Sequence, residues 1–305
     1  MARLTIGGRA LLALVGLPAL GLAQDLEPRR WTHLPVGTNI LGVGYAFTSG
    51  DLSFDPVLQV QDARVEMQTA TVSYMRTFAL GDRTARLDLV IPMQSGRWNG
   101  LVSGTPTSVA RDGLGDPVVR LSANLCGAPA LSGKEFADYR REHPVQTSLG
   151  AALEVKLPLG EYQDDKLLNL GANRFYISPQ LGVLHTSGEW SYELTGTTYF
   201  FTDNNDFFNG STLEQDPLFA VQAHVVKTFG QDWWISAGAA YSWAGESTIN
   251  GTPKNDERST LLSGFSFGMR VNASQSVRFA YIRTDSLNDL GSDTDSFGLG
   301  WSFRF

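Results

Sequence analysis

The last stretch of the chain, residues 295–305, reads DSFGLGWSFRF and alternates between two kinds of side chain. The small or polar set is Ser296, Gly298, Gly300, Ser302 and Arg304, and the large apolar set is Phe297, Leu299, Trp301, Phe303 and Phe305. Because successive side chains of a β-strand point to opposite faces, this stretch predicts a strand with one apolar and one small or polar face. Such a strand at the end of the chain is typical of a β-sheet wall whose outer face contacts lipid.

The same alternation recurs along the chain and predicts an all-β protein. Besides the terminal strand, it covers 41–48, 69–74, 85–91, 118–125, 149–157, 174–183, 190–195, 219–225, 233–243, 264–271 and 276–281. The total is about twelve strands, an even number, as in bacterial outer-membrane barrels. A soluble β-sandwich also alternates, so the alternation by itself leaves both classes open.

The connections and the strand ends separate these two classes. Short polar turns, such as FGQD and NASQS, alternate with long polar loops at 48–63, 95–116, 160–173, 202–216, 244–258 and 284–295. Aromatic residues stand at strand ends, as with Trp233, Tyr241 and Trp243. Loops of unequal length at the two ends and aromatic girdles are both outer-membrane features. We therefore predict a transmembrane antiparallel β-barrel over residues 37–305, with both termini periplasmic.

The N-terminus has the pattern of a secretory signal peptide. Arg3 and Arg9 precede an apolar run over 10–20, and small residues lead to a cleavage site after Ala23. We expect residues 1–23 to be removed and residues 24–36 to form a periplasmic segment. The run is too short for a transmembrane helix. The prediction places the protein in the outer membrane of a Gram-negative bacterium.

Composition and motifs exclude several other functions. The net charge of −7 argues against a nucleic-acid partner, and the single cysteine, Cys126, allows no intrachain disulfide. No residue pattern predicts a catalytic centre, a cofactor or a metal site. The acidic runs QDD, DNNDFF and SDTD leave calcium binding by the loops open. His224 leaves a lipid-acting hydrolase as an alternative, although the stretch around it, VQAHVV, offers no hydroxyl.

One connection on the short-turn side is unusually long. In residues 126–146, Ser132 and Glu135 have the spacing of a capping box, and Pro144 limits the helix that they begin. This predicts a short periplasmic helix near 133–142. The helix is either a solvated cap or, through Phe136 and Tyr139 on one face, a plug of the barrel mouth.

The first and last strands should pair to close the barrel, since an open strand edge in lipid leaves backbone groups unsatisfied. At this seam Gly42, Gly44, Gly298 and Gly300 face inward. These glycines either permit a bend of the wall or form a groove for an apolar solute, or a point of lateral exit. The terminal residues Phe297, Trp301, Phe303 and Phe305 resemble the signal that the outer-membrane assembly machinery recognises. Membrane lipid and lipopolysaccharide are the other expected partners.

The inward-facing positions predict a lumen lined by charges of both signs. The set is Arg86, Asp88, Arg120, Glu154, Lys156, Arg174, Glu193, His224, Arg270, Arg278 and Arg304. Such charges suit either a wet channel or ion-pair ladders that fill a narrow barrel. Basic residues predominate, which favours anionic or polar-headed solutes.

Four stretches resemble an outer-membrane family named for the meta-pathway of phenol degradation. They are LPVGTNILGVGYAFTSGDLSFDPVLQVQDA at 34–63, GLGDPVVRLSANLCGAPAL at 113–131, LPLGEYQDDKLLNLGANRF at 157–175 and QDPLFAVQAHVV at 215–226. The resemblance implies a barrel that takes up small aromatic or other hydrophobic compounds passively, and it implies no catalytic residues. A structural or adhesive barrel remains a further alternative.

Overall fold

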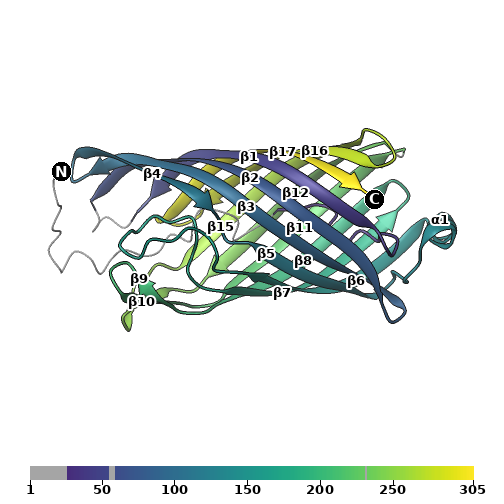
Figure 1. Cartoon of the computed structure of the whole chain (residues 1–305), viewed down its shortest axis with the longest axis horizontal. Helices are drawn as coiled ribbons and strands as arrows, with labels where there is room; N and C mark the ends of the chain where they lie inside the picture. Colours follow the sequence, from purple (N-terminus) through teal and green to yellow (C-terminus); the bar gives the residue numbers. More distant parts are fainter. Residues whose placement is uncertain (1–25, 55–58, 231) are drawn as a thin grey trace.

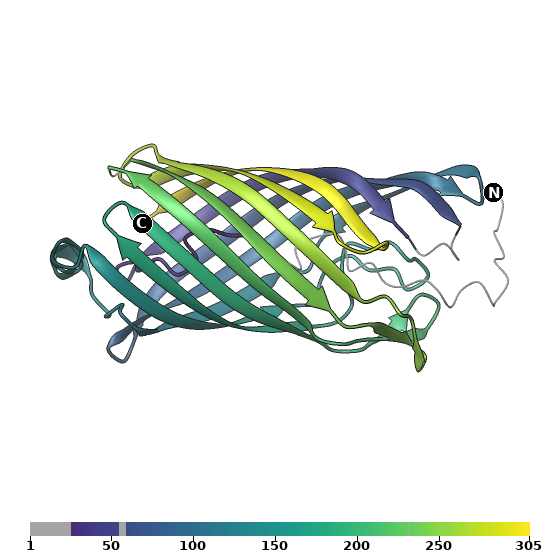
Figure 2. The same ribbon diagram turned by 180° about the vertical axis from the view of Figure 1, so that it is seen from behind.

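The alternating segments form a closed antiparallel barrel (Figures 1 and 2). The computed structural model describes residues 26–54, 59–230 and 232–305, so the predicted signal peptide lies outside the described residues. Within these ranges, twelve strands make up the wall. They are β1 (Asn39–Ser53), β2 (Val60–Leu80), β3 (Arg83–Val102), β5 (Val118–Cys126), β6 (Val145–Lys156), β7 (Tyr176–Ser187), β8 (Trp190–Phe201), β11 (Leu218–Phe229), β12 (Trp233–Ala244), β15 (Arg258–Arg270), β16 (Gln275–Ser286) and β17 (Gly291–Arg304).

Each of these wall strands pairs with the next one along the chain, and β17 pairs back with β1. The closing register runs from Ile40 opposite Arg304 to Ser53 opposite Gly291. The terminal strand is therefore paired along its whole length, as a strand edge in lipid requires. The predicted all-β barrel of about twelve strands and its closure by the last strand are confirmed.

The large apolar sets of the alternating strands face outward, as the pattern predicts. Large apolar side chains such as Leu181 and Leu299 are exposed on the outer face, whereas Arg120 and Glu193 are buried inside. Outward-facing aromatic rings gather near strand ends, where Phe229 stacks on Trp233 with ring centroids 3.8 Å apart. Such rings suit a membrane interface, which is apolar on one side and wet on the other.

At the end with the longer connections, hereafter the long-loop end, the barrel extends well beyond the length that spans a membrane. Strand β2 has 21 residues and β3 has 20, whereas about 9–11 tilted residues suffice to cross. Strand β4 (Thr105–Leu114) forms a hairpin with β3, turning at Ser103 and Gly104, both at positive φ. Most of the loop expected at 95–116 is thus strand. The hairpin buries an apolar cluster of Leu52, Ala63, Val65, Met67, Trp98 and Leu170.

Two other long connections meet in a small second sheet at the same end. Its strands are β9 (Asn204–Phe207), β10 (Ser211–Gln215), β13 (Ser247–Ile249) and β14 (Thr252–Pro253). Phe207, Leu213 and Ile249 form its buried cluster. The segments 202–216 and 244–258, expected as loops, therefore fold against each other at one rim of the barrel.

The predicted helix is present as α1 (Gly133–Glu142) and lies at the opposite, short-turn end (Figure 1). The expected capping box is wrong, because Ser132 makes no side-chain hydrogen bond to the helix. Ser132 still holds the N-cap position, since its carbonyl accepts a hydrogen bond of 3.3 Å from the amide of Phe136, but the next residue, Gly133, has a φ of +52°. Asp138 instead forms ion pairs with Lys134 and Arg141. Among the described residues, no helix has the length and apolar character needed to cross a membrane.

Candidate functional site: the lumen plug and the cavity beside it

The stretch before the first strand lies inside the barrel. Leu26, Trp31 and His33 are almost fully buried, and Leu26 packs with Ala240 and Leu262 of the wall. We call residues 26–34 the plug segment. This corrects the expectation that 24–36 form a periplasmic segment, as far as the described residues go. A stretch with two arginines and a tryptophan finds ion-pair and apolar partners in the lumen that the periplasm would not offer.

Trp31 anchors the plug segment in a slot of the wall. Its indole Nε1 donates a hydrogen bond of 2.8 Å to Thr195 Oγ1 on β8. The ring lies against Gly150 of β6 and Gly182 of β7, where any Cβ would overlap the indole. Neither glycine has a positive φ. Each is therefore required by the close approach of the ring and not by its own backbone conformation.

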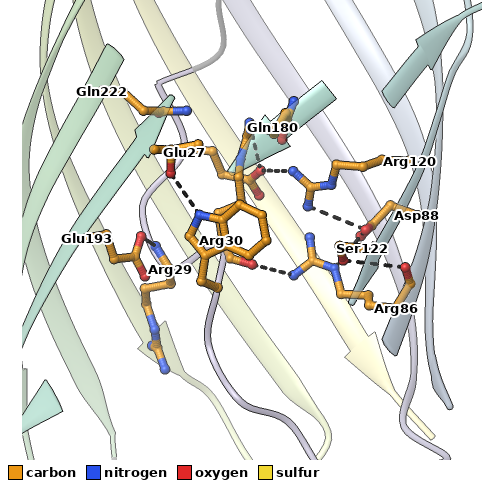
Figure 3. Close-up of polar contacts among 12 residues, drawn as sticks. Glu27, Arg29, Arg30, Arg86, Asp88, Arg120, Ser122, Gln180, Glu193 and Gln222 are labelled. Carbon is orange, nitrogen blue, oxygen red and sulfur yellow. Dashed lines mark hydrogen bonds and ion pairs between the residues drawn. The ribbon is translucent and has the colours of Figure 1, made fainter. Parts of the chain in front are cut away.

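Polar groups of the wall hold the backbone and side chains of the plug segment (Figure 3). The amide of Arg29 donates to the Glu193 carboxylate at 2.8 Å. Arg30 Nη1 donates to Gln180 Oε1 at 3.0 Å, and Arg86 Nη1 donates to the carbonyl of Arg30 at 3.2 Å. These bonds join the segment to three strands, β3, β7 and β8. They fix its path across the lumen.

An ion network lies on the same side (Figure 3). Glu27 is within 3.6 Å of Arg30 and 3.7 Å of Arg120. Asp88 is 2.7 Å from Arg86 and 3.4 Å from Arg120. The sequence left a wet channel and ion-pair ladders as alternatives. Here the charges form a ladder, and its central carboxylate comes from the plug segment.

The guanidinium groups dominate the titration of Glu27. Burial by itself would raise its pKa, but the fields of Arg120, Arg30, Arg86 and Arg278 outweigh burial and lower the pKa to about 2. Glu27 is therefore ionised at all physiological pH values. A permanent negative charge on the plug segment faces a permanently basic wall.

Of the two alternatives for the helix, a solvated cap or a plug formed by Phe136 and Tyr139, the structure favours the cap. No residue of α1 is buried. The two rings instead contact His33, with centroid distances of 4.8 Å from Phe136 and 5.8 Å from Tyr139. His33 Nε2 also lies 2.8 Å from the carbonyl of Pro129. The helix thus supports the plug segment at the short-turn end.

A cavity of about 750 Å³ remains beside the plug segment. One side is formed by β1, β2, β16 and β17, and the other includes Glu27, Arg29 and Trp234. Hydroxyl side chains account for much of its lining: Thr48, Thr69, Thr71, Ser73, Thr260, Ser276, Thr284, Ser292, Thr294, Ser296 and Ser302. Strands from both ends of the sequence contribute to it, because the cavity follows the closing seam.

All four predicted seam glycines line this cavity. None has a positive φ. A Cβ on Gly298 or Gly300 would find no neighbour closer than 3.9 Å, so packing does not require glycine there. The missing side chains of these two residues leave open space, which favours a groove over a bend. On β1, by contrast, a Cβ on Gly42 would come within 2.5 Å of Ser73 Oγ.

Other predicted lumen residues lie away from the cavity. Arg174 lies over Phe201 with its Cζ 4.8 Å from the ring centroid, and Lys156 lies 4.9 Å from the Tyr176 ring centroid. Arg304 is exposed and donates to the carbonyl of Ala273 at 3.0 Å. Arg270 is exposed at the end of β15, and Glu154 pairs in register with Arg120.

His224 is buried in the lumen, with its Nε2 atom 3.2 Å from Gln222 Oε1. An amide thus occupies the position where a Ser–His hydrolase would place its hydroxyl. In the part of the chain that the structure describes, no group of three or more His, Cys, Asp or Glu side chains is placed to hold a metal ion.

Sequence reasoning missed Glu27, Arg29, Arg30 and Trp31 as lumen residues, and its lumen set omits Trp234, although the alternation places that residue opposite Trp233 on the inward face. The signal that could have found the first four is their density. Three of the residues 27–31 are charged and one is tryptophan, directly before a strand that must start at the barrel rim. The inward glycines Gly150 and Gly182 form the surface that the Trp31 ring contacts. The sequence by itself does not show which side chain fills the space beside them.

The comparisons with known proteins agree with this architecture. A family model described as "Putative MetA-pathway of phenol degradation" matches residues 46–305. The chain belongs to this family. The crystal structure of the COG4313 outer membrane channel from Pseudomonas putida F1 is similar to this member, with a TM-score of 0.74 and 21% identity over 92% of this chain and 100% of that chain.

A second solved structure is more distantly similar to this family member. The transport unit of the autotransporter AIDA-I from Escherichia coli has a TM-score of 0.50 and 10% identity over 94% of each chain. No curated protein matches the sequence. The structural likenesses, at these identities, support the barrel fold. The family match confirms the resemblance inferred from the sequence.

Proposed function

We propose that the protein is an outer-membrane channel for passive uptake of small hydrophobic or aromatic compounds. The cavity along the seam carries the proposal. It extends from Met67 and Ser292 in the long-loop half to Ser276 and Ser302 in the short-turn half, alongside the plug segment. Within a closed barrel, a cavity along several strands is suited to passage rather than to a single buried binding event.

The chemistry of the lumen supports a hydrophobic solute. Met67 belongs both to the apolar cluster at the long-loop end and to the lining of the cavity. A solute would pass from this cluster to a wall of glycines, methyl groups and hydroxyls. Threonine and serine accept a polar substituent such as a phenol hydroxyl without imposing a fixed charge.

The orientation follows the convention of outer-membrane barrels. Long connections face outward and short turns face the periplasm. The polar outer parts of β2, β3 and β4 would then lie among lipopolysaccharide head groups, and the exposed apolar belt would contact lipid. Phe297, Trp301, Phe303 and Phe305 remain our proposed signal for the assembly machinery, and residues 1–23 our proposed export signal.

The test fills the cavity and compares a matched change outside it. In Gly298→Phe the ring enters open space beside the plug segment, because a Cβ there has no neighbour within 3.9 Å. In Gly196→Phe, on β8, the same ring points to lipid, and a Cβ there meets nothing within 4 Å. Both proteins should assemble equally well.

The readout is entry of N-phenyl-1-naphthylamine, a neutral aromatic dye, into intact cells of a Gram-negative host. Wild type and Gly196→Phe should admit the dye. Gly298→Phe should admit it only as fast as cells that lack the protein. If the wild type admits no dye and conducts no ions in a planar bilayer, the channel proposal fails and a structural barrel is favoured. Equal entry through all three proteins would mean that the solute does not use this cavity.

A further inference from the structure

Few charged residues line the cavity, and the positive charges outnumber the negative ones. Among its described lining residues, only Glu27, Arg29 and Arg278 are charged, so two guanidinium groups face one carboxylate. The rest of the lining is neutral and carries hydroxyl, methyl and aromatic groups. A cavity with low-dielectric walls and an excess of one charge concentrates the field of that charge. The cavity therefore attracts anions.

Arg278 is the guanidinium that remains available. Glu27 is already shared by Arg30 and Arg120, whose side chains are only 5% and 6% exposed. The third cation, Arg278, is the most distant, with Nη1 3.9 Å from Glu27 Oε1, and its side chain remains 36% exposed. Arginine has five N–H donors, and one long contact uses few of them.

The surroundings of Arg278 leave room for a ligand. Across the β16–β17 ladder Arg278 pairs with Gly300, where the nearest atom to a Cβ would be 3.9 Å away. On the far side, Trp234 lines the cavity and Arg29 lies over its ring, 5.2 Å from the centroid. An anionic head group at Arg278 would have an open floor beside it and a second guanidinium in the same cavity.

Apolar side chains form part of the cavity lining toward the long-loop end. Met67, Leu262 and Ile282 line it on the long-loop side of Arg278. Between Ile282 and Arg278 the inward residue of β16 is Ala280, which pairs with Gly298 of β17. Thr69 and Thr71 of β2 also line this stretch, whereas Thr284, Ser292 and Thr294 lie farther toward the long-loop end. From the long-loop end the lining is therefore hydroxyl, then partly apolar, then small and uncharged up to the guanidinium, so an uncharged tail has space between the outer hydroxyls and a head group at Arg278.

We infer that the cavity selects amphiphilic anions, an aromatic or alkyl tail carrying a carboxylate or sulfonate, and that Arg278 receives the head group. This inference rests on the proposed channel and specifies its solute. The tail lies along the seam toward Met67, and the head group accepts charge-assisted hydrogen bonds from Arg278. Neutral hydrophobic compounds use the same cavity without this interaction.

A matched pair of dyes tests the inference. 8-Anilino-1-naphthalenesulfonate is N-phenyl-1-naphthylamine with one added sulfonate, so the two share a tail and differ by the head group. Entry of each is measured in intact cells that express wild type, Arg278→Gln or Arg278→Lys. The control Arg304→Gln makes the same change at an exposed arginine outside the cavity lining.

Arg278→Gln should lower entry of the sulfonate about tenfold and leave entry of the neutral dye unchanged, as expected for loss of one charge-assisted contact. Arg278→Lys should restore part of the sulfonate entry, and Arg304→Gln should behave as wild type. Wild-type entry of the neutral dye without the sulfonate would overturn the inference and leave the channel proposal standing. Equal changes for both dyes in Arg278→Gln would show that Arg278 only holds the plug segment through Glu27, which also overturns it. Entry of neither dye would refute both proposals.

Discussion

The two sides of the lumen are built from opposite kinds of side chain. On β3, β5, β7 and β8 the inward positions carry long polar groups such as Arg86, Arg120, Gln180 and Glu193, and the plug segment rests against them. On β1 and β17 the inward positions are glycine, alanine, serine or threonine over most of the membrane height, and the cavity lies there. The barrel thus binds the plug segment against one wall and leaves a cavity along the other.

The difference teaches that glycine has two roles in this lumen. Gly150 and Gly182 lie on the plugged side, where their missing side chains are replaced by the Trp31 ring. Gly298 and Gly300 lie on the open side, where nothing takes the place of a side chain. The same residue type therefore indicates a contact in one wall and a passage in the other.

The largest effect should come from variants that remove the Trp31 ring or fill the space beside Gly150 and Gly182 that it occupies. Trp31→Ala removes a buried indole at a cost of about 3–5 kcal/mol, which lowers the ratio of docked to undocked segment a hundredfold or more. Gly182→Leu should have the same result, because its side chain would occupy the space of the ring. Both variants should show higher single-channel conductance in planar bilayers.

Gly196→Leu is the matched control for the slot, since it introduces the same side chain on the lipid face of β8. It should conduct as wild type does. Wild-type conductance in both Trp31→Ala and Gly182→Leu, with normal heat-modifiable migration of the barrels, would mean that Trp31 does not hold the plug segment.

The next effect contrasts the two faces of the terminal strand. Trp301 points to lipid, and Ser302 lines the cavity. An arginine in the middle of the lipid belt costs about 2–4 kcal/mol, so Trp301→Arg should sharply reduce the folded protein in outer-membrane fractions. Ser302→Arg should be recovered nearly as well as wild type. Loss of Ser302→Arg instead would show that this part of the lumen is packed.

The wall could be predicted from the sequence because its signal is local. Alternation over a few residues fixes which side chains face lipid, and it located all twelve wall strands, including the pairing of the last strand with the first. The β3–β4 hairpin was missed since Gly, Ser, Asn and Thr dominate residues 99–108 and have the composition of a loop. There, pairing of neighbouring strands outweighs low β-propensity.

The plug segment could not be predicted because its contacts are distant in the sequence. Trp31 and Thr195 are separated by 164 positions, as are Arg29 and Glu193. The segment itself has no period that would assign it to a surface. The helical spacing of Phe136 and Tyr139, by contrast, can be seen in a single stretch, and it suggests a plug in α1 as one alternative. Ion pairs between residues distant in the sequence, and a ring packed on distant glycines, leave no such periodic pattern.

Acidification should weaken the docking of the plug segment. Because the pKa of Glu27 is lowered to about 2, its carboxylate stabilises docking above about pH 4.5, and this stabilisation is lost as the pH falls from 4.5 toward 2. With its side chain 30% exposed, the loss should be about 1–2 kcal/mol, below that of a fully buried pair. A spin label at Thr32→Cys, in a Cys126→Ser background, should become more mobile over this range.

Two other carboxylates, Asp88 and Glu193, lie near the plug segment, so Glu27→Gln is the necessary control. In that variant the label should be more mobile than in wild type already at pH 7, and the acid-induced change between pH 4.5 and 2 should be smaller. An unchanged acid transition in Glu27→Gln would assign the release to those other carboxylates.

The smallest effect should be a difference in stability between glycine-to-alanine variants on β1 and on β17, the two strands of the open wall. A Cβ on Gly44 of β1 would come within 2.6 Å of Thr71 Oγ1, whereas one on Gly300 of β17 would have no neighbour closer than 3.9 Å. Replacing glycine by alanine in a strand gains about 0.5–1 kcal/mol when the site is free of strain. Gly300→Ala should therefore unfold at higher urea concentration than wild type. Gly44→Ala should gain less, because the Thr71 hydroxyl must rotate away.

Adding Thr71→Ala should restore the gain in Gly44→Ala, since the obstructing atom is then gone. If Gly300→Ala is instead the destabilised protein, glycine is needed there for the shape of the wall, and the groove along the seam is a by-product of how the barrel closes.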